Sequence, residues 1–376
     1  MLSDPFVAVD EVLERRDPAA ALDYLIARFQ LERNYPLLFE ARLMRKRLDL
    51  GLPLIQAQSA SDYPPESREA YEKAMMDAAR EAGQFFLAEG KIDRAWPYFR
   101  AIGDIAPVRS AIEIAQPGED VEGVIQIAFQ EGVHPVKGLE LILARYGMCR
   151  AITSFGMYAV EEGRQECIHL LAKSLHTELM ANIQRAVEAR EGQPADAANI
   201  AGLIEGRDWL FGEYDYYVDT SHLMSVIQYC PEAARSDTLL LIRDLCAYGK
   251  RLSAQFHSQS HPPFEDPFTD YGMYAEALLG ENVDAAVQHF QEKVKASDPE
   301  EVGTMPAEVL VKLLVRLERY QEALDVSVAH LTNAHESSCP TALQLCHMAG
   351  DHQRLRQLAR EKGDLLSYAA ATLQTP

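Results

Sequence analysis

Apolar residues recur at helical spacing along almost the whole chain, and no other feature of the sequence constrains its fold more. Apolar side chains stand at positions i, i+3, i+4 and i+7 over long stretches, which gives each predicted helix one apolar face. Alternating patterns typical of β-strands are nearly absent. The helical period is clearest in four stretches: Pro18–Arg33, Arg68–Glu89, Gln165–Arg190 and Met305–Arg319. The sequence therefore predicts an all-α protein.

Short breaks separate the predicted helices. They are two to five residues long, contain Gly, Asp or Pro, and have the length that joins antiparallel helices. Glycine fits just after a helix end because it tolerates the left-handed backbone conformation, and a neighbouring Asp, Asn or Thr can cap the next helix. Such breaks lie at Glu89–Asp93, Glu161–Arg164, Leu279–Val283 and Ala349–His352. We therefore expect a string of helical hairpins.

One hairpin carries small and aromatic residues at fixed offsets. Gly83 is followed by Phe86 at +3, Gly90 at +7, Ala95 at +12, Phe99 at +16 and Pro107 at +24. Small side chains at Gly83 and Ala95 let two helices approach closely, and Gly90 makes the turn. Pro107 then ends the second helix, and Pro97 falls in the first turn of that helix. The spacing, over residues 79–107, resembles the tetratricopeptide repeat, a helix–turn–helix unit of about 34 residues.

Weaker versions of this unit recur elsewhere. Asp17–Leu25 and Glu318–Val326 resemble its turn and second helix, and Gly280–Phe290 has the turn glycine and the later aromatic residue. The resemblance covers roughly residues 10–110 and 268–365. It implies a superhelix of stacked antiparallel helical hairpins, a tetratricopeptide-like α-solenoid, whose concave groove binds a peptide or a protein surface.

The middle of the chain departs from the repeat. We predict an N-terminal hairpin array over residues 1–190, a non-repeat insert over 191–267 and a C-terminal array over 268–376, joined in one continuous superhelix. The insert ends with a loop at Phe256–Phe268 that is rich in Pro and His. Long loops in compact helical proteins are often functional, so we place a candidate site in or beside this insert.

A divalent metal site is one hypothesis for the insert. Asp219 and His222 lie three residues apart at a predicted helix start, so both side chains can lie on one face. His134 and His176 would join them if the neighbouring hairpins pack together. Three imidazoles and a carboxylate would suit Zn²⁺, Fe²⁺ or Mn²⁺.

A purely structural interpretation of the same residues stays open. Asp219 or Thr220 is then the cap of the following helix, and His134 is a turn residue. His176 would be a packed or solvated side chain at the margin of its helix. Likewise, the loop after Phe256 is interpreted either as a lid or as a surface loop. It is expected to carry His257, His261, Glu265, Asp266 and Asp270.

Two functions follow from these features. The first is a binding or scaffold protein that recognises a peptide, a protein or a small ligand, with Arg207, Trp209 and Tyr214 lining the groove. The second is an enzyme on a helical-repeat frame, in which Asp215 or Tyr217 acts as acid or base beside the metal. The sequence alone does not decide whether the protein is an enzyme.

Charge and composition limit the partners and the compartment. Asp and Glu outnumber Lys and Arg by 57 to 36, and the formal net charge is −21. This acidity disfavours nucleic acid and anionic lipid and favours partners with basic or neutral contact surfaces. The sequence contains no apolar stretch of membrane-spanning length. We expect no signal peptide, and the six scattered cysteines predict a reducing cytoplasm.

Overall fold

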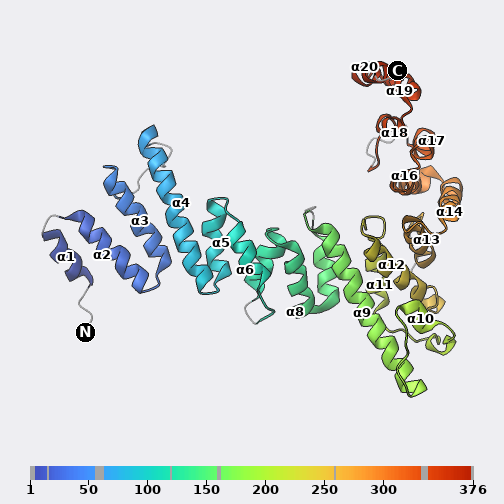
Figure 1. Cartoon of the computed structure of the whole chain (residues 1–376), viewed down its shortest axis with the longest axis horizontal. Helices are drawn as coiled ribbons and strands as arrows, with labels where there is room; N and C mark the ends of the chain where they lie inside the picture. Colours follow the sequence, from blue (N-terminus) through green and yellow to red (C-terminus); the bar gives the residue numbers. More distant parts are fainter. Residues whose placement is uncertain are drawn as a thin grey trace. The chain divides into compact units, whose positions relative to one another are not determined.

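The computed structural model of the chain describes residues 5–14, 17–55, 63–118, 121–158, 162–257, 260–331 and 338–373. Every regular element in these ranges is a helix, which confirms the predicted all-α class (Figure 1). Within them, no helix is long and apolar enough to cross a bilayer.

The chain divides into two compact units. Unit 1 contains residues within 1–145 and 158–163, and unit 2 contains residues within 146–157 and 164–376. The division falls inside helix α8 (Pro135–Gly156), where Gly147 leaves the helical conformation with φ 78° and ψ −176°. The remaining helices of unit 1 are α1 (Pro5–Glu14), α2 (Pro18–Leu31), α3 (Tyr35–Asp49), α4 (Pro65–Ala88), α5 (Ile92–Ala101), α6 (Ala106–Glu113) and α7 (Glu122–Ile125), which continues into a π-helical turn, Gln126–Gln130.

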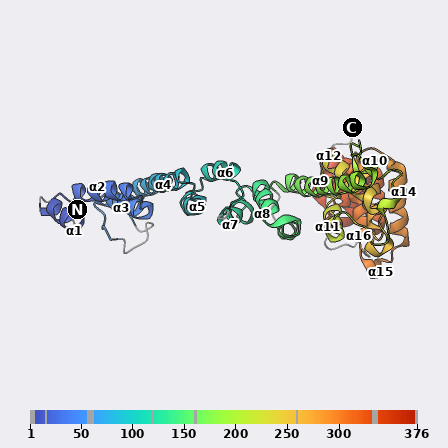
Figure 2. The same cartoon turned by 90° about the horizontal axis from the view of Figure 1, so that it is seen from below.

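Helices of unit 1 pack against their neighbours along the chain. Contacts join α2 to α3, α3 to α4, α4 to α5 and α5 to α6, and both views show α2, α3 and α4 side by side (Figure 1, Figure 2). Tyr35 of α3 stacks on Phe85 of α4 and meets the edge of Phe86, with ring centroids 5.0 Å apart in each pair. This neighbour-to-neighbour packing is compatible with a helical repeat.

The predicted hairpin at Gly83–Phe99 forms as α4 and α5. A Cβ atom at Gly83 would lie 2.6 Å from the Phe99 ring, so any side chain at this position would force the ring or the helices to shift. Gly90 makes the turn with φ +73°, and Ala95 and Phe99 are fully buried.

Two proline predictions for this hairpin are wrong. Pro107 does not end the second helix, because α5 stops at Ala101 and Pro107 lies in the first turn of α6. Pro97 lies inside α5 rather than in its first turn. The N–H groups of a first helical turn have no partner within the helix, so proline, which lacks an N–H, is tolerated there. A proline that follows one helix can therefore belong to the start of the next.

Unit 2 follows the same neighbour pattern. In order, contacts join α12 to α13, α13 to α14, α14 to α16, α16 to α17, α17 to α18, α18 to α19 and α19 to α20. Helices α10, α11 and α12 also pack on the long helix α9. The bounds are α9 (Arg164–Glu191), α10 (Ile200–Ile204), α11 (Thr220–Ile227), α12 (Ser236–Gly249), α13 (Pro267–Leu278), α14 (Val283–Ala296), α15 (Pro299–Val302), α16 (Met305–Arg316), α17 (Tyr320–His330), α18 (Ala342–Met348), α19 (His352–Lys362) and α20 (Leu365–Leu373).

The segment predicted as an insert lies in unit 2 and contains helices α10, α11 and α12. Residue 190 falls near the end of α9, and residue 267 begins α13. The domain boundaries near 190 and 267 stay predictions, as does the continuity of the superhelix.

Candidate functional site

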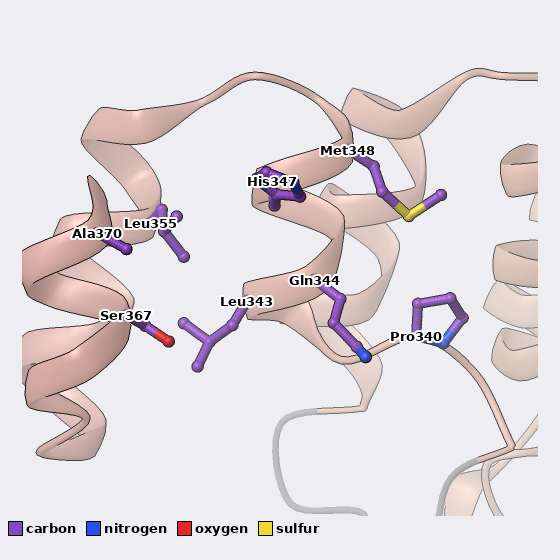
Figure 3. Close-up of a pocket in the computed structure, with 8 residues that line it drawn as sticks. All are labelled: Pro340, Leu343, Gln344, His347, Met348, Leu355, Ser367 and Ala370. Atoms are coloured by element: carbon purple, nitrogen blue, oxygen red, sulfur yellow. The ribbon is translucent and has the colours of Figure 1, made fainter. Parts of the chain in front are cut away.

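An apolar groove lies among the last three helices of unit 2. It has a volume of about 530 Å³, within the range of about 300–1,000 Å³ that is common for ligand pockets. Leu343 of α18 and Ser367 of α20 point toward one another across it (Figure 3). The lining residues are Pro340, Leu343, Gln344, His347, Met348, Leu355, Ser367 and Ala370.

Helix α18 presents two different faces. Its groove side carries Leu343 and His347, four residues apart, whereas Leu345 and Cys346 are fully buried in the core. A capping box fixes the start of this short helix: Thr341 Oγ1 accepts from the Gln344 N–H, and Gln344 Oε1 accepts from the Thr341 N–H at 2.7 Å. The capping box therefore satisfies two backbone N–H groups at the start of α18.

Caps also set the other two helices. Asp351 accepts from the Arg354 N–H at 2.9 Å and starts α19, which contributes the buried Leu355 to the groove. Gly363 ends α19 in the left-handed conformation, and Asp364 then starts α20. Hydrogen bonds from the hydroxyl and the N–H of Ser367 lower the pKa of Asp364.

The groove is uncharged. Five of its eight lining residues are apolar, and the polar ones are a glutamine, a histidine and a serine. No Asp, Glu, Lys or Arg lines it. A ligand in this groove would therefore gain binding free energy by burying apolar area rather than by forming ion pairs.

The outer face of α20 continues this apolar surface. Leu365, Leu366 and Leu373 are 80%, 85% and 85% exposed, whereas Ala371 on the opposite side is fully buried. Large exposed apolar patches on a protein surface mark interaction sites. Residues 365–376 contain no charged side chain.

The same region differs from the rest of the chain in charge. Residues 338–376 carry four basic side chains, at Arg354, Arg356, Arg360 and Lys362, and three acidic ones. The remainder of the chain holds all of the acidic excess. The groove therefore belongs to a nearly neutral end of a strongly acidic protein.

Asp219, predicted as a metal ligand or a helix cap, is a cap. It starts α11 by accepting from the N–H of Ser221 at 2.8 Å and from its hydroxyl at 2.6 Å. The Ser221 hydroxyl is the main cause that lowers the pKa of Asp219, and the nearby His222 adds to it.

His176 is engaged by a buried carboxylate. Its Nε2 lies 2.7 Å from Oδ2 of Asp244, a residue that also accepts from the N–H groups of Ile200 and Ala201 at the start of α10. Burial raises the pKa of Asp244, but these hydrogen bonds outweigh it and hold the pKa below its ordinary value. The pair joins α9, α10 and α12.

His134 lies in unit 1, whereas His176, Asp219 and His222 lie in unit 2. The His134 Nδ1 accepts from the Lys137 N–H at 3.4 Å, near the start of α8. Across the described ranges, no group of three or more His, Cys, Asp or Glu side chains is placed to hold a metal ion. The site formed by these four residues stays a prediction.

The predicted ligand residues of the insert contact the protein itself. Arg207 donates two hydrogen bonds to Glu191, at 2.8 and 3.1 Å, and the Arg190 guanidinium lies 4.4 Å from the Trp209 ring centroid. Tyr214 is 72% exposed. A ligand role for Arg207 would compete with its ion pair.

The predicted acid–base pair lies in a segment fastened to α9 and α12. Asp215 accepts from the Gly212 N–H at 3.1 Å. The backbone of Tyr217 is held by Asn182 and by the Tyr248 hydroxyl. Burial raises the pKa of Tyr217, and the Asp215 charge raises it further, so this phenol stays protonated at neutral pH. The catalytic roles of both residues stay predictions.

The groove at α18–α20 was not among the sequence predictions. The stretch Gly350–Leu355 matches the tetratricopeptide spacing poorly, whereas the insert holds the denser cluster of polar and aromatic residues. A usable signal was present: leucines at 366 and 373, two helical turns apart, in a stretch without charge.

Comparisons with known protein families, with curated proteins and with solved structures found no match.

Proposed function

We propose that the protein is a tetratricopeptide-like helical-repeat protein that binds an amphipathic helical segment of a protein in the groove of α18–α20. The single observation that carries this proposal is the uncharged groove beside a helix that exposes three leucines. The neighbour-to-neighbour packing and the close crossing at Gly83 support the repeat architecture.

The chemistry of the groove selects the guest. A helix laid in an apolar groove inserts side chains at i, i+3 or i+4 and i+7. Because the groove lining lacks charge, the inserted face must be apolar. Because residues 338–376 are nearly neutral, the charge of the flanking residues should matter less than the apolar face.

A fluorescence anisotropy titration tests this proposal. The probe is a fluorescein-labelled peptide of about 18 residues, five helical turns, with leucines on one face and no net charge. We expect saturable binding to the full chain. Leu343→Glu, which puts a charge into the uncharged groove, should weaken binding at least about tenfold, or about 1.4 kcal/mol.

Two controls make the test specific. Leu343→Met keeps an apolar side chain in the groove and should bind almost as the parent chain does. Leu31→Glu puts the same charge on a leucine of unit 1 that is 85% exposed and lies outside the groove, and it should leave the affinity for the peptide unchanged. The absence of saturable binding, or equal affinities for the parent chain and Leu343→Glu, contradicts the proposal.

A further inference from the structure

The outer face of α20 has the properties of a guest for the groove beside it. Leu366 and Leu373 stand at i and i+7, two helical turns apart, and Ala370 at i+4 lies between them at the edge of the groove that it also lines. This is the spacing of side chains that a helix inserts into an apolar groove. Both leucines of this stripe are 85% exposed. Helices α18–α20 therefore present both an apolar groove and an exposed apolar helix face that could fill such a groove.

Charge indicates which molecule supplies the guest. Two copies that each carry a net charge of −21 repel one another over most of their surfaces. Repulsion is smallest at residues 338–376, where basic and acidic side chains nearly balance, and α20 itself has no charged residue. A basic partner would gain little at this end, because the acidic side chains that would attract it lie elsewhere in the chain.

Two-fold symmetry also favours a second copy of this chain as the molecule that supplies the helix. In a two-fold pair the same surface acts on both copies, so a residue that inserts on one copy is also received on the other. A surface that combines a groove with an exposed apolar helix meets this requirement by itself. Each leucine stripe would then cover the groove of the other copy.

We propose that the occupant of the groove is helix α20 of a second copy of this chain, so that two copies pair reciprocally through α18–α20. This inference rests on the proposed function, since it takes the groove as a helix-binding site and names the helix. The contact is small compared with the interfaces of about 1,200–2,000 Å² in stable complexes, so the pair forms reversibly and depends on concentration.

Sedimentation velocity of the full chain over a range of concentrations tests the pairing. We expect a monomer–dimer equilibrium that higher NaCl strengthens, because salt screens the repulsion between the two acidic chains. The double variant Leu366→Glu, Leu373→Glu should raise the dissociation constant at least about tenfold, with Leu31→Glu as the matched control. Circular dichroism checks that each variant keeps its helical content.

Mixing two variants distinguishes groove insertion from other pairings. The α20 double variant keeps its groove, whereas Leu343→Glu keeps its α20 leucines. Each alone should be monomeric, but a mixture of the two restores one of the two contacts and should yield a heterodimer. A mixture that stays monomeric, or a Leu343→Glu variant that dimerises as the parent chain does, overturns the inference.

Peptide binding separates the failure of this inference from the failure of the proposed function. A parent chain that stays monomeric at every concentration but binds the labelled amphipathic peptide overturns the second copy as occupant and leaves the groove as a binding site. A parent chain that neither dimerises nor binds the peptide overturns both. Dimerisation that the α20 substitutions do not affect also overturns the inference, because the interface then lies elsewhere.

Discussion

At the residue scale, buried carboxylates show how unit 2 satisfies polar groups inside its core. Asp270 is fully buried and accepts from His289 Nε2 at 2.7 Å, Lys293 Nζ at 3.0 Å and the Asp266 N–H at 2.9 Å. The expectation that Asp270 belongs to the loop after Phe256 is wrong. It lies in α13, where it links the start of that helix to α14. A buried carboxylate with this many donors is a structural group.

Removal of the Asp270 charge should destabilise the folded protein. Asp270→Asn leaves Lys293 and His289 facing a neutral amide in a buried site, and we expect the free energy of unfolding to fall by about 3 kcal/mol. Urea denaturation measures it. The matched control is Asp284→Asn, because the Asp284 side chain is 93% exposed although it pairs with Arg319 at 2.7 Å. The control should change stability by less than about 1 kcal/mol, and equal losses in the two variants would contradict the assignment.

Asp244 predicts a pH dependence. Its folded pKa lies below the ordinary value of 3.8, so its contribution to stability is present above that value and is lost as the pH falls through the folded pKa. We expect the parent chain to be more stable than Asp244→Asn at pH 7, and the difference to shrink below about pH 4. Urea midpoints across this range measure it, and a difference that grows toward low pH would refute the prediction.

At the element scale, close helix crossings decide which helices can pair. The α4–α5 crossing depends on Gly83, because Phe99 of α5 occupies the place where a side chain would stand. A similar crossing joins α12 to α13, where a Cβ atom at Gly249 would overlap the Phe268 ring. The repeat spacing identified the first crossing, whereas the second lies outside any repeat match.

Substitution of Gly83 tests the first crossing. Alanine is favoured over glycine in a helix by about 1 kcal/mol, yet its Cβ would collide with Phe99, and overpacking costs about 1–3 kcal/mol. We therefore expect Gly83→Ala to be neutral or destabilising, and Phe99→Leu to make the alanine more favourable in a double-mutant cycle. Gly156→Ala is the control, because its nearest neighbour would be 3.9 Å away. A clear gain of stability in Gly83→Ala alone would show that the helices are not in close contact.

At the scale of the whole molecule, the chain divides into two compact units, and the three segments expected from the sequence stay a prediction. Unit 1 has a core built from α2 to α7, in which Leu38, Phe99 and Ile112 are fully buried. Unit 2 has fully buried side chains of its own, such as Leu175, Tyr274 and Phe290. Each unit has the means to fold as a cooperative element.

Two unfolding transitions are therefore expected. Because Gly83 lies in unit 1 and Asp270 in unit 2, Gly83→Leu should move one transition and Asp270→Asn the other. Differential scanning calorimetry of the full chain measures both. A single transition that both substitutions shift equally would show that the chain unfolds as one cooperative unit.

Local features of the sequence determined the helices, many of the turns and one hairpin crossing. The apolar period predicted α2, α4, α9 and α16 to within three residues at each end, because that period reflects which face of a helix is buried. Gly90 and the Asp219 cap could likewise be interpreted from the nearest neighbours in the chain. Short-range rules suffice for such features, since backbone geometry and capping act over a few residues.

Only the tertiary structure decided which side chains lie close together. His176 meets Asp244, 68 residues away, and Asp270 meets Lys293 on the next helix. The groove at α18–α20 likewise depends on how three short helices pack, and no single one of them encodes it. Contacts between distant residues depend on the packing of whole helices, and the period of one helix carries no information about the face of another.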